Sequence, residues 1–207
     1  MRSIQRRLIV MLAYGGNAHH RICARMREES LTCSCSMGLT EKEIGQFIDA
    51  AVRDQVAARK MIDARPDLLN ARWMHNETIL HFLAVEGYAD AVRFLAAAGA
   101  AIDDVNEFGD TALIDVAVLG NAEIAKLLLE HGANPNAPSK TQGNPLGAAV
   151  WSGNVELVEL LLAAGARAEF DDLWLALEAG RAPRGEMEPV LARYGISRGP
   201  PGGLKLN

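Results

Sequence analysis

The sequence has few aromatic residues, few cysteines and no long apolar run. Aromatic residues make up 5% of the 207 positions while hydrophobic residues make up 49%, which favours a stack of small Ala- and Leu-rich helices over an aromatic-rich β-sandwich. No stretch of about 20 apolar residues occurs, so we expect no membrane span. Three cysteines, all before residue 37, cannot form a disulfide framework. We therefore expect a reducing compartment, the cytoplasm.

Motifs for catalysis are also missing. From residue 38 onward there is no phosphate-binding loop, no His-Glu-x-x-His, no Gly-x-Ser-x-Gly and no paired-cysteine ligand set. Two acidic pairs, Asp103 with Asp104 and Asp171 with Asp172, fall where loops are expected. We interpret them as solvated, because side chains adjacent in sequence seldom face one substrate. The sequence therefore predicts no enzyme, no catalytic residue and no cofactor or metal in this part of the chain.

Charge is unevenly distributed along the chain. The net charge is -5, but residues 1–37 hold six Arg and two acidic residues, about +4, which leaves about -9 for the remainder. Phosphate contacts need clustered Lys and Arg, so nucleic-acid binding by the acidic remainder is disfavoured. A partner with a basic surface is the better match.

The first 37 residues fit nothing that follows them. Arginines precede a short apolar run at 8–14, the outline of a weak secretory signal, with export as the minority interpretation. The alternatives are a disordered leader or a reading frame whose working start is Met37. This leader holds cysteines and histidines whose spacing does not fit the common zinc fingers, although a metal- or redox-responsive role through them stays open: Cys23, Cys33, Cys35, His19 and His20.

The stretch from residue 78 to 165 repeats itself every 33 residues. Equivalent segments begin at Thr78, Thr111 and Asn144, and glycines recur at the same interval at two other places. Within residues 121–131 the apolar positions cover one face of a helix, and Gly132 follows as a helix stop. Such a period is the signature of a solenoid, in which each unit needs its neighbours to bury its apolar face.

The repeated residues resemble those of ankyrin repeats. The resemblance is carried by Thr78-Ile-Leu-His81, by Thr111-Ala-Leu and by Leu-Leu-Leu-Glu-His-Gly-Ala-Asn at 127–134. It implies two antiparallel helices and a protruding turn in each unit, with protein binding as the activity. It also implies that Thr78 and His81 tie adjacent loops together by hydrogen bonds. A catalytic role for His81 is the weaker interpretation, since no Cys, Ser or carboxylate partner sits at a supporting spacing.

We predict an all-α, ankyrin-like helix-turn-helix solenoid of about five stacked units with modified end caps, acting as a monomer. A capping box of Thr40 and Glu43 begins the first unit, and Pro183 with Gly185 makes the turn inside the last. The expected divisions are a basic leader at 1–37, a repeat domain at 38–196 with units at about 40–77, 78–110, 111–143 and 144–172 and a cap at 173–196, and a flexible tail at 197–207.

What remains for function is a surface. Turn tips and the exposed side of each first helix are expected to line one concave face. Large apolar and acidic residues occupy these places, and Trp is prominent among interface hot spots. For the apolar residues, packing in the core is the alternative. The candidate partner-binding residues are Trp73, Met74, Phe82, Glu86, Glu107, Phe108, Asp115, Leu119 and Trp151.

We therefore predict a non-catalytic module that binds a partner protein, one with a basic or apolar surface, through the concave face and the turn tips. A rigid, pre-ordered face would dock such a partner at little ordering cost. A second hypothesis is a regulatory or accessory subunit of an enzyme encoded elsewhere. A closed pocket in place of an open groove would favour that second hypothesis.

Overall fold

A computed structural model describes residues 38–140, 143–168 and 184–196. Its regular elements within these ranges are helices joined by loops with isolated antiparallel bridges, so the predicted all-α class is confirmed. All described residues belong to one compact unit, Cys35–Asn207. None of the helices described is both long and apolar enough to cross a membrane. The predicted leader, the first helix of the predicted cap and the tail lie outside the described residues.

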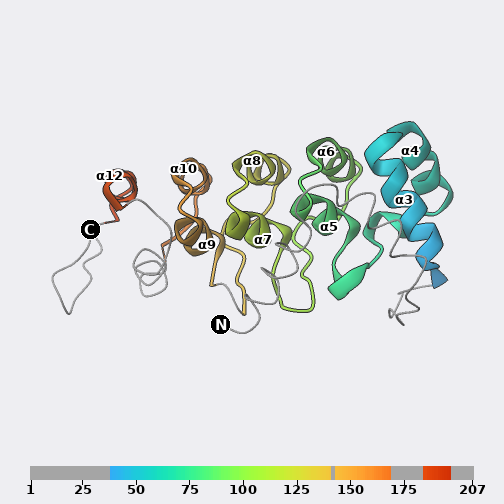
Figure 1. The fold of residues 1–207 in the computed structure, drawn as a ribbon, viewed down its shortest axis with the longest axis horizontal. Coiled ribbons are helices and arrows are strands. Elements are labelled where there is room, and N and C mark those ends of the chain that lie inside the picture. The colour runs from blue at the N-terminus through green and yellow to red at the C-terminus, as the bar shows by residue number, and fades with distance from the viewer. Residues whose placement is uncertain (1–37, 141–142, 169–183, 197–207) are drawn as a thin grey trace. The chain divides into compact units, whose positions relative to one another are not determined.

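Helices follow one another in pairs along the chain (Figure 1). The first pair is followed by two short 3-10 helices, and one further helix follows the last described pair. The elements are α3 (Glu41–Arg53) with α4 (Gln55–Ala64), η2 (Pro66–Asn70), η3 (Met74–Asn76), α5 (Ile79–Val85) with α6 (Ala89–Ala97), α7 (Ala112–Leu119) with α8 (Ala122–Glu130), α9 (Pro145–Ser152) with α10 (Val155–Ala163), and α12 (Arg184–Arg193).

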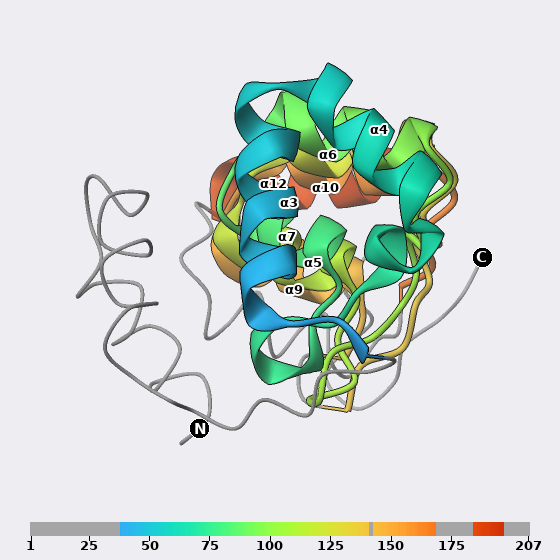
Figure 2. The same ribbon diagram turned by 90° about the vertical axis from the view of Figure 1, so that its right-hand side faces the viewer.

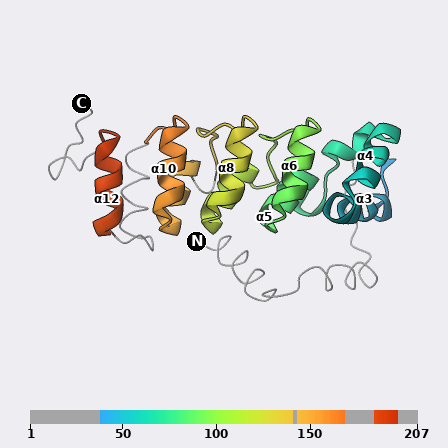
Figure 3. The same ribbon diagram turned by 90° about the horizontal axis from the view of Figure 1, so that it is seen from above.

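The pairs stack so that equivalent helices pack on each other. In one layer α7 packs between α5 and α9; in the other α8 packs between α6 and α10, and α12 packs on α10 (Figure 1). Figure 2 looks along the stack from the α3 and α4 end. Figure 3 shows from above the layer of second helices, which contains α6, α8 and α10 together with α12. The core lies between the two layers. Leu80, Leu113 and Leu146, spaced 33 residues apart, are 0–1% exposed there.

Local capping explains where the first helices begin. Thr78, Thr111 and Asn144 each accept a hydrogen bond, on the side-chain oxygen, from the backbone N–H three residues later, at 3.1, 3.4 and 2.8 Å. This bond satisfies one of the donors that a helix start leaves unpaired. The prediction that these three residues begin equivalent helices is confirmed. Gly120 and Gly153 end α7 and α9 with φ of 71° and 80°, a conformation that suits glycine.

The two ends of the stack differ from the middle. Thr40 and Glu43 form the predicted capping box at the start of α3. At the other end α12 buries Met187 and Leu191 and is followed by Gly195 with φ 75°. The prediction that Gly185 makes a turn is wrong, because Gly185 lies in the first turn of α12.

A ladder of hydrogen bonds joins the loops between neighbouring units. The side-chain oxygens of Asn70, Asp103 and Asn136 accept from the backbone N–H of a residue 31 positions later, at 2.8, 2.9 and 2.7 Å. Successive rungs are 33 residues apart. Asp104, beside the second rung, pairs with Arg72 at 2.7 Å. Asp103 is exposed and Asp104 is half-buried in the loop, and both carboxylates also couple units. Asp171 and Asp172 lie outside the described residues.

The ladder predicts a difference between two substitutions of one residue. Asp103→Ala removes the acceptor of the middle rung and should lower the free energy of unfolding by about 1 kcal/mol. Asp103→Asn should leave it nearly unchanged, because Asn already serves at the rungs on either side. Urea denaturation followed by circular dichroism measures both. Equal losses in the two variants would show that the rung contributes nothing beyond its charge.

Candidate protein-binding surface

Hairpin loops before α5, α7 and α9 extend past the first helices (Figure 1). Each is closed by a backbone hydrogen bond: the N–H groups of Trp73, Asn106 and Ser139 donate to carbonyls four residues later at 2.7, 3.0 and 2.8 Å. We call residues 74–76, 107–109 and 140 the loop tips. Equivalent closure at a 33-residue interval places the loop tips in a row beside the first helices.

Direct contacts hold the first loop tip to the second. The imidazole Nδ1 of His75 lies 2.7 Å from Glu107 Oε1, and the Glu107 N–H donates to the His75 carbonyl at 3.0 Å. The His75 ring also lies 5.9 Å, centroid to centroid, from the ring of Phe108. His75 and Asn76 have φ of 56° and 58°, which is rare outside glycine and indicates a backbone held in place by its surroundings. His75 was not among the predicted residues.

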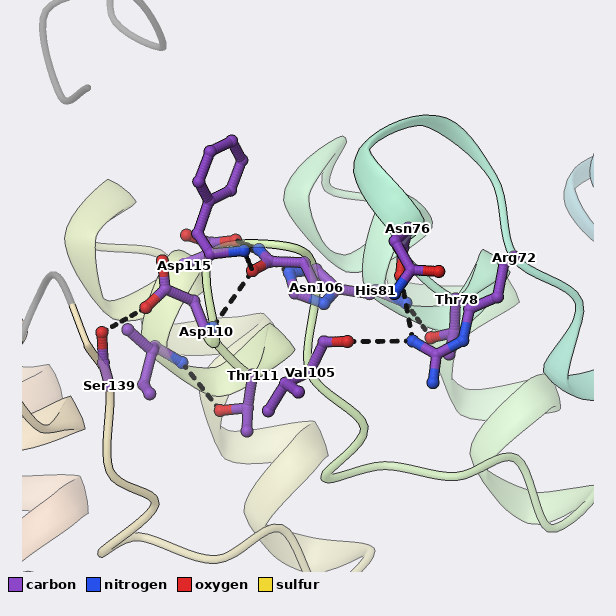
Figure 4. Close-up of polar contacts among 12 residues, drawn as sticks. Arg72, Asn76, Thr78, His81, Val105, Asn106, Asp110, Thr111, Asp115 and Ser139 are labelled. Atoms are coloured by element: carbon purple, nitrogen blue, oxygen red, sulfur yellow. Dashed lines mark hydrogen bonds and ion pairs between the residues drawn. The ribbon is translucent and has the colours of Figure 1, made fainter. Parts of the chain in front are cut away.

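The second hairpin is braced from both sides (Figure 4). Asn106 Oδ1 accepts from the N–H groups of Phe108 and Asp110 at 2.9 and 3.0 Å, which fixes the loop internally. Arg72 Nη1 donates to the Val105 carbonyl at 2.9 Å from one side, and Ser139 Oγ donates to the Asp110 carboxylate from the other. The three loops therefore form one hydrogen-bonded assembly.

The first helices contribute three rows of side chains, each at a 33-residue spacing. The innermost row is buried, the middle row is half-buried, and the outer row ranges from exposed to half-buried. These rows are Phe82, Asp115 and Ala148; Val85, Val118 and Trp151; and Glu86, Leu119 and Ser152.

Six of the nine candidate residues reach solvent. Met74 and Leu119 are 48% and 41% exposed. Glu86 and Glu107 are also exposed, and Phe108 and Trp151 are half-buried. Apolar and acidic side chains therefore do share one surface, on the loop tips and on the middle and outer rows.

The expectation that Trp73, Phe82 and Asp115 are exposed is wrong, since each is 6–7% exposed. Burial of Trp73 agrees with the core alternative for this residue. Phe82 and Asp115 belong to the innermost row, which is buried.

Hydrogen bonds to His81 and Asn106 offset the cost of burying the Asp115 carboxylate. His81 Nε2 lies 2.8 Å from Asp115 Oδ2, and Asn106 Nδ2 donates to the same oxygen at 3.1 Å. His81 thus bonds to the next unit, as the resemblance implied, but through a side chain on α7. The sequence interpretation that His81 has no carboxylate partner is wrong, because Asp115 lies one repeat plus one residue away.

Glu86 is exposed, yet burial raises the pKa of its carboxyl group. Desolvation also raises the pKa of Tyr88, with a smaller contribution from the Glu86 charge, while nearby Arg53 lowers it. Neighbouring protein atoms therefore displace part of the water around the Glu86 carboxyl group, although the side chain is exposed. A cationic group of a partner would find a poorly solvated carboxylate there.

Known proteins resemble this chain. A family model described as ankyrin repeats (3 copies) matches residues 47–139 and 80–172. Cyclin-dependent kinase 4 inhibitor B of Homo sapiens is 41% identical over 92 residues, 44% of this chain and 66% of that protein. The Bos taurus protein of that name is 37% identical over 113 residues, which are 54% of this chain and 84% of that protein. Serine/threonine-protein kinase 12 of Arabidopsis thaliana is 32% identical over 105 residues, which are 46% of this chain and 23% of that protein.

Glu86→Gln should stabilise the fold near pH 7 and not below pH 4. The raised folded pKa means that the unfolded chain gives up this proton first, so wild-type stability falls as pH rises above the ordinary value of 4.5. The neutral variant escapes this loss, and the gain should stay below about 1 kcal/mol because the side chain is exposed. Urea denaturation at both pH values measures it, with Glu130→Gln on the exposed side of α8 as control. A gain equal at the two pH values would contradict the desolvation.

Proposed function

The chain belongs to the ankyrin repeat family, and we propose that it acts as a non-catalytic module whose partner protein contacts the loop tips and the outer rows of the first helices. We call the proposed contact residues the binding face: Met74, His75, Glu86, Glu107, Phe108, Leu119 and Trp151. The observation that carries the proposal is the bonding between loops, which fixes the first two loop tips before a partner arrives. A fixed surface loses little conformational entropy on binding.

The composition of the binding face indicates the partner's chemistry. Phe108, Leu119 and Trp151 offer apolar contact area, and aromatic residues are enriched among residues that dominate binding energy. Glu86 and Glu107 add negative charge beside them. An apolar surface flanked by basic residues is therefore the complement. Glu86, Glu107 and the basic residues of the partner would meet at the solvent-exposed edge of the contact. Raising the salt concentration should therefore slow association more than it speeds dissociation.

A protein kinase is the first partner class to test. Several relatives are named as inhibitors of cyclin-dependent kinase 4, and another is named a serine/threonine-protein kinase. Binding to a separate kinase would make this chain a regulatory subunit of an enzyme, the second hypothesis from the sequence. Incubating the purified chain with kinases of its own host, and measuring both complex formation and phosphorylation rate, separates binding with inhibition from binding alone.

Truncating two residues of the binding face should weaken capture of the partner. We expect Phe108→Ala combined with Leu119→Ala to raise the dissociation constant about tenfold or more, because central interface residues each contribute on the order of 2 kcal/mol. Capture from native lysate, quantified by mass spectrometry, identifies the partner, and titration with the purified partner then gives the constants.

The matched control removes two exposed apolar side chains elsewhere. Val56 on α4 and Tyr194 after α12 are 68% and 45% exposed, and replacing both by Ala should leave binding unchanged. Equal weakening in the control pair, or wild-type affinity in the binding-face pair, would contradict the proposed site. A large fall in melting temperature for the binding-face pair would assign its residues to the core instead.

A further inference from the structure

Three buried ionisable side chains meet between two units. Glu77 precedes α5, His81 lies in its first turn, and Asp115 lies on α7; they are 8%, 1% and 6% exposed. One possible ligand atom from each lies within 4.8 Å of the other two. We call these residues the Glu77–His81–Asp115 cluster, and Figure 4 shows His81 and Asp115 on their two units.

The repeat framework itself does not require this cluster. One repeat later, the equivalent positions hold Asp110, Ile114 and Ala148, and the carboxylate of Asp110 bonds to Ser139. One repeat earlier they hold only apolar residues, Ile44, Ile48 and Phe82. The next interface therefore stacks with one buried carboxyl group, that of Asp110, where this interface buries an imidazole and two carboxyl groups. Burying two acidic groups side by side is costly unless a positive charge or a proton accompanies them.

The donor set matches a particular class of cation. One imidazole nitrogen and two carboxylate oxygens are ligands that Zn²⁺ and its neighbours among the divalent transition metals accept. Mg²⁺ and Ca²⁺ prefer oxygen ligands alone. Zinc takes such ligands at about 2.0–2.2 Å, so a tetrahedral site needs ligand atoms roughly 3.4 Å apart. His81 Nε2 and Asp115 Oδ2 lie 2.8 Å apart, so they must separate by about 0.6 Å to bind one zinc ion. The Glu77 ligand atom lies within 4.8 Å of both, so it must close on the ion as the third ligand.

The second nitrogen of the His81 ring allows the hydrogen bond to be exchanged for a metal bond. Without a metal, Nε2–H donates to Asp115, whereas coordination needs the lone pair of Nε2. Nδ1 is buried and has no hydrogen-bond partner among the described residues, so the ring proton can move to Nδ1 without displacing another bond there. The His81–Asp115 hydrogen bond is lost and three metal–ligand bonds form. The positive charge of the ion compensates the two carboxylates.

We propose that the Glu77–His81–Asp115 cluster binds one divalent transition-metal ion and that the ion clamps the unit of α5 to the unit of α7. The ligands come from two units, so the assembled site exists only when those units are stacked. Binding to the folded state alone raises stability with metal concentration. The site lies beneath the binding face, and its occupancy stiffens the α5–α7 interface without adding to the exposed surface.

Zinc titration of the full chain tests the proposal. Cys23, Cys33 and Cys35 are replaced by Ser in every sample, since thiolates of the leader also bind zinc. Calorimetry with ZnCl₂ on chelator-treated protein, together with the melting temperature with and without zinc, should show one saturable site and a zinc-dependent rise. Glu77→Gln and Asp115→Asn, which keep the size of the side chain and one acceptor oxygen, should each weaken zinc binding about tenfold or more.

Glu107→Gln is the matched control, because it removes one carboxylate beside a different histidine, the exposed His75, and should bind zinc like the parent protein. Parent protein without a zinc-dependent rise in melting temperature would overturn the proposal, whatever the variants do. So would parent-like zinc affinity in Glu77→Gln and Asp115→Asn. Circular dichroism without zinc checks that each variant is folded.

Discussion

No unit of this chain can bury its apolar face alone, and every other feature depends on that constraint. The helices from α5 to α10 have seven to nine residues, too few to be stable in water by themselves. Stacking supplies the missing contacts, with Leu80, Leu113 and Leu146 buried at the same place in successive units. Because each unit packs on the preceding unit, the constant 33-residue interval also determines where every loop and every exposed row of side chains lies.

Side chains between the units refine this framework in two ways. Asn70, Asp103 and Asn136 repeat with the interval and couple each loop to the next in the same manner. His75 with Glu107, and His81 with Asp115, each occur once and distinguish one interface from the others. The periodic bonds maintain the stack, whereas the single bonds give the α5–α7 region its own surface and its own buried charges.

Periodicity in the sequence predicted the helix starts at Thr78, Thr111 and Asn144, because N-caps and glycine stops act within one unit. Burial was harder to predict, because it depends on the neighbouring unit. An offset of 33 places Phe82 and Asp115 on a first helix but does not say that this row is buried. The Asp115–His81 bond joins residues 34 positions apart, in two different units. The residues within one unit therefore do not predict it. The turn predicted at Gly185 was wrong for a local reason, because an exposed helix turn tolerates glycine.

We propose that the loop tips and first helices form one rigid surface on which a partner protein docks. Hydrogen–deuterium exchange of the free and partner-bound chain tests it most directly. We expect new protection in the loop tips and at the exposed ends of α5, α7 and α9, with little change in α4, α6 and α8. Protection gained mainly on the second-helix layer, with the loop tips unchanged, would contradict the account.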